Sequence, residues 1–335
     1  MTPDETAQAI TTLVLVLVFV AVLLAANAGD TRPTWRVVAF AGLAGICTVV
    51  ALLALLAMAN AAAAGGVSRR LALGSLMQFL GAALAPLMLL PAARARLAKV
   101  LHDFRPESAI NAVAASLYVL VVSFFLSQQV SVDQLQSIKN SISSTGQSPS
   151  LAFIIATNQL PFLVVSFAGV GVVVRRDGRA ALQRLGLYWP GWRWILLSLG
   201  VAVLLVIFGI VFDEVMTRVT PAQSKAINDV SQLLLKNVDT PWAAIILALA
   251  AGIGEEIIFR GAVQPRFGIV AASLLFAVMH TQYSVSLATL EIFILGIFLG
   301  LLRKRAGVIA SIIAHAGYDL ILLMIPYAYY YFQHH

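Results

Sequence analysis

The chain has 335 residues, of which 60% are hydrophobic and only 11% are charged, and its mean hydropathy is +0.92. A soluble domain carries charge on roughly 25% of its residues, so this composition excludes a soluble protein and predicts an all-α, polytopic transmembrane bundle. The formal net charge of +7 does not indicate nucleic-acid binding, because the basic residues form short clusters between apolar segments.

Apolar segments follow one another along the whole chain, and a transmembrane helix needs about 20 such residues. We predict ten spans, at 10–28, 37–64, 71–92, 109–127, 151–174, 194–212, 241–263, 268–284, 286–302 and 307–328. Their boundaries can shift by several residues and the last segment contains Pro326, so eight or nine spans are the alternatives. The residues before the first segment include Asp4 and Glu5 but no basic residue. A signal peptide usually begins with basic residues, so this segment is predicted to be a retained helix.

Basic residues divide unevenly between the connections. With the N-terminus outside, fifteen of them fall in the odd-numbered connections and six in the even-numbered ones. Because Lys and Arg favour the cytoplasmic side, we predict that both termini lie outside. Arginine outnumbers lysine and alanine is abundant, as in GC-rich bacteria, so the expected location is the bacterial inner (plasma) membrane.

Two predicted outer connections are long. Residues 128–150 are rich in Ser, Gln and Asn, which favours a flexible or partly helical segment. Residues 213–240 place apolar residues such as Ile227 and Val230 at helical spacing, which predicts an amphipathic helix on the membrane surface. Such a helix would be either a lid over a site or a simple connector.

Ionisable residues within the predicted spans are concentrated near the C-terminal end. At bilayer depth such residues cost several kcal/mol, so they are rare unless they pair or take part in function. They are Glu255, Glu256, Arg260, His280, Glu291, His315 and Asp319.

The acidic pair can serve two roles on one helix. Glu256 and Arg260 are four residues apart, so they share a helix face and can form an ion pair. Glu255 is rotated by about 100° from Glu256 and can point into a cavity. Gly252 and Gly254 would let another helix approach closely.

The two histidines lie on other predicted helices. Phe276 and His280 share one helix face, and so do His315 and Asp319, where the carboxylate can orient the imidazole or accept its proton. Two histidines and a glutamate from three helices could activate water. General base catalysis is one route, and a bound metal with these three side chains as ligands is the other.

The three motifs together resemble those of a known family. Glu255-Glu256-x-x-x-Arg260, Phe276-x-x-x-His280 and His315-x-x-x-Asp319 are similar, in this order, to the motifs of the CPBP intramembrane proteases. That family includes the type II CAAX prenyl endopeptidases and the bacterial Abi proteins. The resemblance covers about 151–335, whereas 1–150 is predicted to be an added four-helix membrane module of unknown role.

The resemblance implies an intramembrane endopeptidase that acts on membrane-embedded or membrane-associated peptides or proteins. In the family, the acidic pair and the first histidine are taken to activate water, and the second histidine and its following polar residue to stabilise the oxyanion. Carried over to this chain, the expected catalytic residues are Glu255, Glu256, His280, His315 and Asp319, with Arg260 and Phe276 as structural support.

Several points stay open at the level of sequence. Many relatives have asparagine at the position of Asp319, and an ionised carboxylate cannot donate a hydrogen bond to an oxyanion. If a divalent metal such as zinc is bound, its expected ligands are Glu255, His280 and His315, whereas a glutamate-activated water needs no metal. Glu291 is either an interfacial carboxylate or part of the cavity lining.

Two other classes of function compete with the protease. One is a non-enzymatic membrane protein, such as an immunity factor or scaffold, that keeps these residues as structure. The other is a proton-coupled transporter that uses the buried carboxylates and histidines as a relay. No nucleic acid is expected as a partner.

Overall fold

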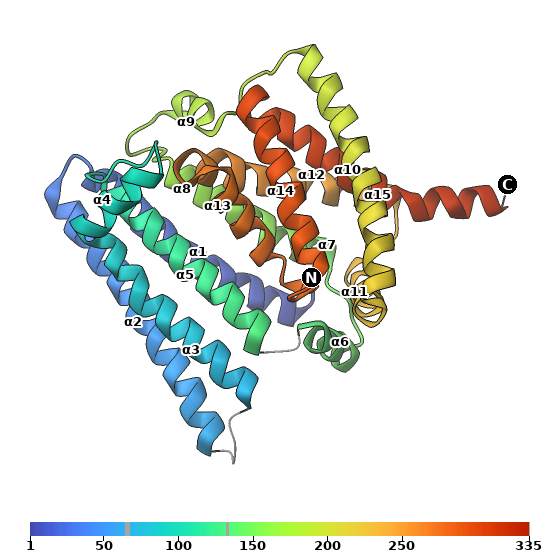
Figure 1. Cartoon of the computed structure of the whole chain (residues 1–335), viewed down its shortest axis with the longest axis horizontal. Coiled ribbons are helices and arrows are strands. Elements are labelled where there is room, and N and C mark those ends of the chain that lie inside the picture. Colours follow the sequence, from blue (N-terminus) through green and yellow to red (C-terminus); the bar gives the residue numbers. More distant parts are fainter. Residues whose placement is uncertain (64–67, 132–133, 335) are drawn as a thin grey trace.

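The computed structural model describes residues 1–63, 68–131 and 134–334, and within them all regular secondary structure is helical (Figure 1). The elements are α1 (Pro3–Gly29), α2 (Pro33–Ala63), α3 (Arg69–Leu84), η1 (Ala85–Leu89), α4 (Pro91–Val100), α5 (Ala109–Ser131), α6 (Gln134–Thr145), α7 (Leu151–Ile154), η2 (Ile155–Gln159), α8 (Leu160–Gly169), α9 (Gly178–Leu185), α10 (Trp192–Val219), α11 (Pro221–Leu235), α12 (Pro241–Glu256), η3 (Ile257–Val263), α13 (Gln264–Met279), η4 (Thr281–Tyr283), α14 (Leu287–Ala306) and α15 (Val308–His334). Residue 64, at the end of the predicted second span, and residues 132–133, within 128–150, lie outside the described residues.

Eight helical segments of the described chain are long and apolar enough to cross a membrane, which confirms an integral, all-α polytopic bundle. They are Pro3–Gly29, Pro33–Ala63, Arg69–Leu89, Ala109–Ser131, Leu151–Gly169, Trp192–Val219, Pro241–Met279 and Val308–Ile325. The helix α14 corresponds to the predicted ninth span and is not among the eight, since its 20 residues include Glu291 and a basic C-terminal turn.

The longest of these segments, Pro241–Met279, folds back on itself and so combines two predicted spans. A straight helix would separate Glu255 from His280 by about 37 Å, at 1.5 Å per residue. Their side chains instead come within 3.8 Å of each other. The break is at Gly268, whose φ of 81° and ψ of 174° are not helical, and glycine adopts such a backbone without a steric penalty.

The second arm of this hairpin is short. From Gly268 to Met279 it extends about 18 Å, roughly half of the hydrocarbon thickness of a bilayer. The predicted eighth span at 268–284 is therefore a half-depth helix followed by the turn η4, rather than a complete crossing. Because the chain turns back at this depth, His280 lies at the level of Glu255, in the middle of the first arm.

The predicted inner connections meet at one end of the bundle, where Figure 1 shows α4 and α9. Arg175 forms an ion pair with Asp30, which joins the fifth connection to the first. Arg266, in the seventh connection, donates a hydrogen bond to the carbonyl oxygen of Asp103, in the third, at 3.3 Å. This grouping agrees with the predicted alternation of the spans, while the side that faces the cytoplasm stays a prediction.

The predicted outer segments meet at a different end, near α6 and α11 in Figure 1. The backbone N–H of Ser150 donates to the Glu5 carboxylate at 2.7 Å, and Lys139 lies 2.8 Å from Asp229. Both long connections contain a helix, α6 and α11, and α11 buries Ile227 and Val230 as their helical spacing predicted. The helix α10 is longer than the sixth predicted span, since it continues to Val219.

The N-terminal helices pack closely against the rest of the chain. Asn27 of α1 donates to the carbonyl oxygen of Ala168 at 3.0 Å. On α5, the Tyr118 hydroxyl donates to the Ala271 carbonyl and the Gln129 amide to the Val278 carbonyl, both at 2.9 Å. The two contacts from α5 hold the second arm of the hairpin near both of its ends. Residues 1–150 therefore help to position the segment that leads to His280.

Candidate active site

Side chains from α12, α13 and α15 converge on a single carboxylate oxygen, Oε2 of Glu255. Nε2 of His280 lies 3.8 Å from this oxygen and Nε2 of His315 lies 3.9 Å from it. Asp319 Oδ2 lies 3.5 Å from His315 Nε2. The structure thus brings together Glu255, His280, His315 and Asp319, which the sequence places on three separate helices.

Two glycines allow this convergence. A Cβ atom at Gly252 would lie 2.8 Å from the Cβ of Ala316 on α15, closer than real Cβ atoms approach. A Cβ atom at Gly254 would lie 2.6 Å from the side-chain oxygen of Gln159. Both glycines therefore let neighbouring segments approach α12, as predicted, and they bring His315 within reach of the acidic pair.

Glu256 is fully buried and has both oxygens engaged. Oε2 accepts a hydrogen bond from Nε of Arg260 at 3.1 Å, and Oε1 lies 2.9 Å from Nδ1 of His315. Arg260 is also fully buried, and its guanidinium carbon lies 5.0 Å from the ring centroid of Phe276, in cation–π contact. Arg260 and Glu256 thus form a buried unit that fixes the orientation of the His315 ring.

The hydrogen bond at Nδ1 of His280 determines what its other nitrogen can do. Nδ1 lies 2.7 Å from the carbonyl oxygen of Phe276, which can only accept, so Nδ1 carries the proton. In the neutral ring, Nε2 is then an acceptor, and it faces Oε2 of Glu255. Two acceptors 3.8 Å apart match a water molecule, which has two O–H groups to donate.

Two residues near the site were missed by the sequence analysis. Gln159, buried in the π-helical turn η2, donates to Oε1 of Glu255 at 3.4 Å, whereas Oε2 has no hydrogen-bond partner among the described residues. Tyr283 stacks on His280 with ring centroids 6.1 Å apart and an angle of 5° between the ring planes. The signal for Gln159 was a pair of adjacent amides, Asn158 and Gln159, in an apolar span, directly before Leu160 and Pro161.

Phenylalanine side chains close one side of the site, and we call Phe162, Phe259 and Phe276 the aromatic wall. Successive ring centroids are 5.7 Å and 5.1 Å apart. The Phe276 ring also contacts both histidines, with centroids 4.7 Å from His280 and 5.9 Å from His315. The wall therefore separates the polar site from the space beyond Phe259.

The arrangement of the acidic and histidine side chains bears on metal binding. In the described parts of the chain, no group of three or more His, Cys, Asp or Glu side chains is arranged to hold a metal ion. The predicted ligands Glu255, His280 and His315 converge but do not form such a group. Glu291, the remaining intramembrane carboxylate, lies beside Gly209 of α10 and makes no contact with the site histidines in the described structure.

Comparison with known proteins agrees with this geometry. Residues 237–321 match the family described as type II CAAX prenyl endopeptidase Rce1-like. Over this segment the chain is similar to the Rce1-like family. The segment contains all three motifs, from Glu255 to Asp319, so the predicted resemblance is confirmed there.

A curated relative matches with partial coverage. It is the sporulation-killing factor biosynthesis protein SkfC of Bacillus subtilis (strain 168), 30% identical over 143 residues. This alignment covers 39% of the present chain and 27% of SkfC, so the chain spans about a quarter of the length of this relative. No solved structure matches the chain.

Proposed function

We propose that this protein is an intramembrane endopeptidase that hydrolyses peptide bonds with a water molecule activated by Glu255 and His280. The observation that carries the proposal is the pair of opposed acceptors, Oε2 of Glu255 and Nε2 of His280, 3.8 Å apart in a protein-lined site. The Rce1-like match over 237–321 supports the reaction class.

The proposed reaction begins with a water bound between these two acceptors. Glu255 removes one proton from the water while His280 accepts the second hydrogen bond and holds the oxygen in place. The oxygen attacks the carbonyl carbon of the scissile bond, and a tetrahedral intermediate with a negatively charged oxygen forms. When the C–N bond breaks, the protonated Glu255 returns its proton to the leaving nitrogen, so the carboxylate is regenerated.

His315 is placed to stabilise the charge on the intermediate. Its Nδ1 is fixed by Glu256, and its Nε2 faces the same space as Glu255 Oε2 and Asp319 Oδ2. With a proton on Nε2 it would donate a hydrogen bond to the oxyanion, and such a donor typically contributes about a hundredfold or more to the rate. We assign Asp319 to holding that proton on His315. An ionised carboxylate can accept a hydrogen bond from the imidazole, but it cannot donate one to an oxyanion.

Glu256, Arg260 and Phe276 complete the proposal as supporting residues. Because both oxygens of Glu256 are occupied, it orients His315 rather than acting as a second base. Arg260 balances the Glu256 charge, and Phe276 supplies both a ring against the histidines and the carbonyl that fixes the His280 tautomer. No step of this scheme requires a metal, and a chelator tests that point directly.

The proposed substrates are membrane-embedded or membrane-associated peptides and proteins in a bacterial inner membrane. The site lies among apolar helices, which suits a substrate that reaches it from the bilayer. SkfC is named for the biosynthesis of a sporulation-killing factor, so we include the precursor of such a factor among the proposed substrates.

The test is cleavage of a library of membrane peptides by the purified chain in detergent. Wild type is compared with Glu255→Ala and His280→Ala, each with and without a chelator. We expect cleavage by wild type in both conditions and a loss of at least about a hundredfold in either variant. Variants that stay folded and cleave as fast as wild type would favour the scaffold or transporter alternative, and loss of wild-type cleavage with the chelator would show a metalloenzyme.

A further inference from the structure

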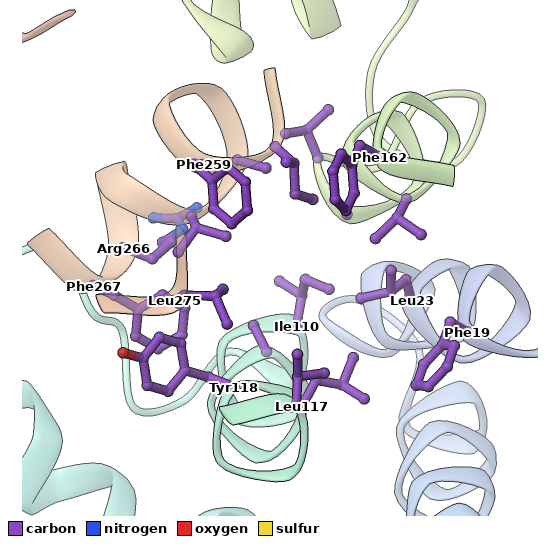
Figure 2. A pocket seen from close by; sticks show the side chains of 18 of the residues that line it. Phe19, Leu23, Ile110, Leu117, Tyr118, Phe162, Phe259, Arg266, Phe267 and Leu275 are labelled. Carbon is purple, nitrogen blue, oxygen red and sulfur yellow. The ribbon is translucent and has the colours of Figure 1, made fainter. Parts of the chain in front are cut away.

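A cavity of about 400 Å³ lies on the other side of the aromatic wall, between the N-terminal helices and the core (Figure 2). Helices α1 and α5 supply one part of its lining, and α8, η3 and α13 supply the other. Its volume is within the range of small-molecule sites, roughly 300–1,000 Å³. None of the five predicted catalytic residues lines it, so it is distinct from the proposed active site.

The greater part of the lining is apolar. Figure 2 shows Phe19, Leu23 and Leu117 turned toward the same space as Phe162 and Leu275, from four different helices. A peptide segment in such a cavity would leave its backbone N–H and C=O groups without partners, which is costly. A hydrocarbon chain has no such groups and fits this lining.

Positive charge is confined to one part of the lining, formed by Arg175, Arg176, Arg184 and Arg266. Arg175 is paired with Asp30, but no carboxylate of the described chain lies within ion-pair distance of the other three. Burial and the neighbouring arginines, Arg266 first among them, lower the pKa of Arg184 to about 10. The cluster therefore carries excess positive charge that an anionic group would neutralise.

The charged part of the cavity and its apolar part are arranged along α13. Arg266 and Phe267 lie beside the break at Gly268, and Met279, which also lines the cavity, is at the far end of the helix. These ends are about 18 Å apart, at 1.5 Å per residue. The cavity thus has a positively charged end and a long apolar part. This arrangement is complementary to a lipid phosphate with one acyl chain attached.

We propose that this cavity is a binding site for an anionic phospholipid, with its phosphate at Arg176, Arg184 and Arg266 and one acyl chain along α13. The arginines belong to the connections predicted to face the cytoplasm, where anionic lipid headgroups bind basic pockets between transmembrane helices. The bound chain would fill the space between α1, α5 and the core. It would contact Phe259 of the aromatic wall and would stabilise the packing of the N-terminal helices on α13.

The test uses the full chain in a neutral detergent, with lipid added back. Binding is followed by native mass spectrometry and by the thermal unfolding temperature, with phosphatidylglycerol, phosphatidylcholine of the same chains, or inorganic phosphate. We expect phosphatidylglycerol to remain bound and to raise the unfolding temperature, and the other two to do neither. Equal effects of phosphatidylcholine, or an equal effect of inorganic phosphate, would overturn the proposal.

Variants separate this site from general lipid binding at the protein surface. The double variant Arg184→Gln/Arg266→Gln should weaken phosphatidylglycerol binding by roughly tenfold or more, since it removes two charge-assisted contacts. Ala114→Phe, which places a ring in the apolar part and keeps every arginine, should also displace the lipid. The matched control is Arg179→Gln, an exposed arginine of the same helix α9, which should bind as wild type does. Unchanged binding in both cavity variants would place the lipid elsewhere and contradict the proposal.

Discussion

The two sides of the aromatic wall have opposite chemistry. On one side of the wall, carboxylates and histidines lie around Glu255. On the other side, arginines line one end of an apolar cavity. A single hairpin, Pro241–Met279, contributes to both, since η3 directs Arg260 to the site and Phe259 to the wall. The comparison shows how a short membrane segment can keep carboxylates and arginines apart, with phenylalanines in edge-to-face contact between them.

The largest structural effect is expected where a buried charge loses its partner. Arg260→Met would remove the arginine that balances the charge of fully buried Glu256 and would leave only His315 beside that carboxylate, and breaking a buried ion pair typically costs about 3–5 kcal/mol. Thermal unfolding in detergent should show a large drop, and the double variant Glu256→Gln/Arg260→Met should recover part of it. An equal drop in the single and double variants would mean that the charge balance on this side of the wall is not what stabilises it.

The next effect concerns the approach of α12 to α15. Gly252→Leu would force the two helices apart, because even a Cβ atom at this position meets Ala316 at 2.8 Å. Displacement of catalytic groups by about 1 Å can cost a hundredfold in rate, so cleavage should fall by that order. Gly200→Leu is the control, since nothing lies within 4 Å of a Cβ there. Similar cleavage by both variants would show that this contact does not position the site.

A smaller effect is expected from the residue that holds Glu255. Gln159→Leu removes the hydrogen bond to Oε1 and leaves Oε2 and the histidines in place. We expect kcat to fall by roughly tenfold with little change in KM, as for a hydrogen bond that orients a charged group. A change in KM alone would instead place Gln159 in substrate binding.

The next effect concerns the hydrogen bonds by which α5 holds α13, the helix that leads to His280. Gln129→Leu removes the bond to the Val278 carbonyl, two residues before His280, and should cost about 1 kcal/mol. Tyr118→Phe removes the bond to the Ala271 carbonyl, nearer to Gly268. If the N-terminal helices position His280, cleavage should fall a few-fold more in Gln129→Leu than in Tyr118→Phe, at equal unfolding temperatures. Equal rates would contradict that link.

The smallest effect lies away from both sides of the wall, at the Lys139–Asp229 pair. The hydrogen bond from Lys139 lowers the pKa of Asp229, so the pair stabilises the fold above the unfolded carboxyl pKa of about 4. This contribution is lost as the pH falls through the lowered value. Lys139→Gln should therefore reduce the unfolding temperature slightly at pH 7, and the difference should shrink toward pH 3. A constant difference would assign the effect to packing.

The sequence predicted which side chains come together, because helical spacing is a local and periodic pattern. The spacing of Glu256 and Arg260 defined an ion pair on one helix face, and the structure places their atoms 3.1 Å apart. The three motifs contain the side chains that converge in the structure. The catalytic roles of these side chains stay proposals. The resemblance was predicted over about 151–335, and the family match confirms it over 237–321.

Other features depend on contacts that no local pattern encodes. The fold-back at Gly268 makes the predicted eighth span a half-depth helix, and apolar periodicity cannot distinguish such a helix from a full span. Gln159 reaches Glu255 from a π-helical turn 96 residues earlier in the chain. The cavity requires α1 and α5 to pack against α8 and α13, so it could be found only from the tertiary structure.

The most direct test of the central claim compares two intramembrane carboxylates in the same protein. Cleavage of one membrane peptide is measured in proteoliposomes for wild type, Glu255→Gln and Glu291→Gln. The geometry at Oε2 of Glu255 predicts loss of at least about a hundredfold in Glu255→Gln and nearly wild-type rates in Glu291→Gln, which lies beside Gly209 instead. Wild-type cleavage by folded Glu255→Gln, or equal losses in the two variants, would contradict Glu255 as the base that activates water.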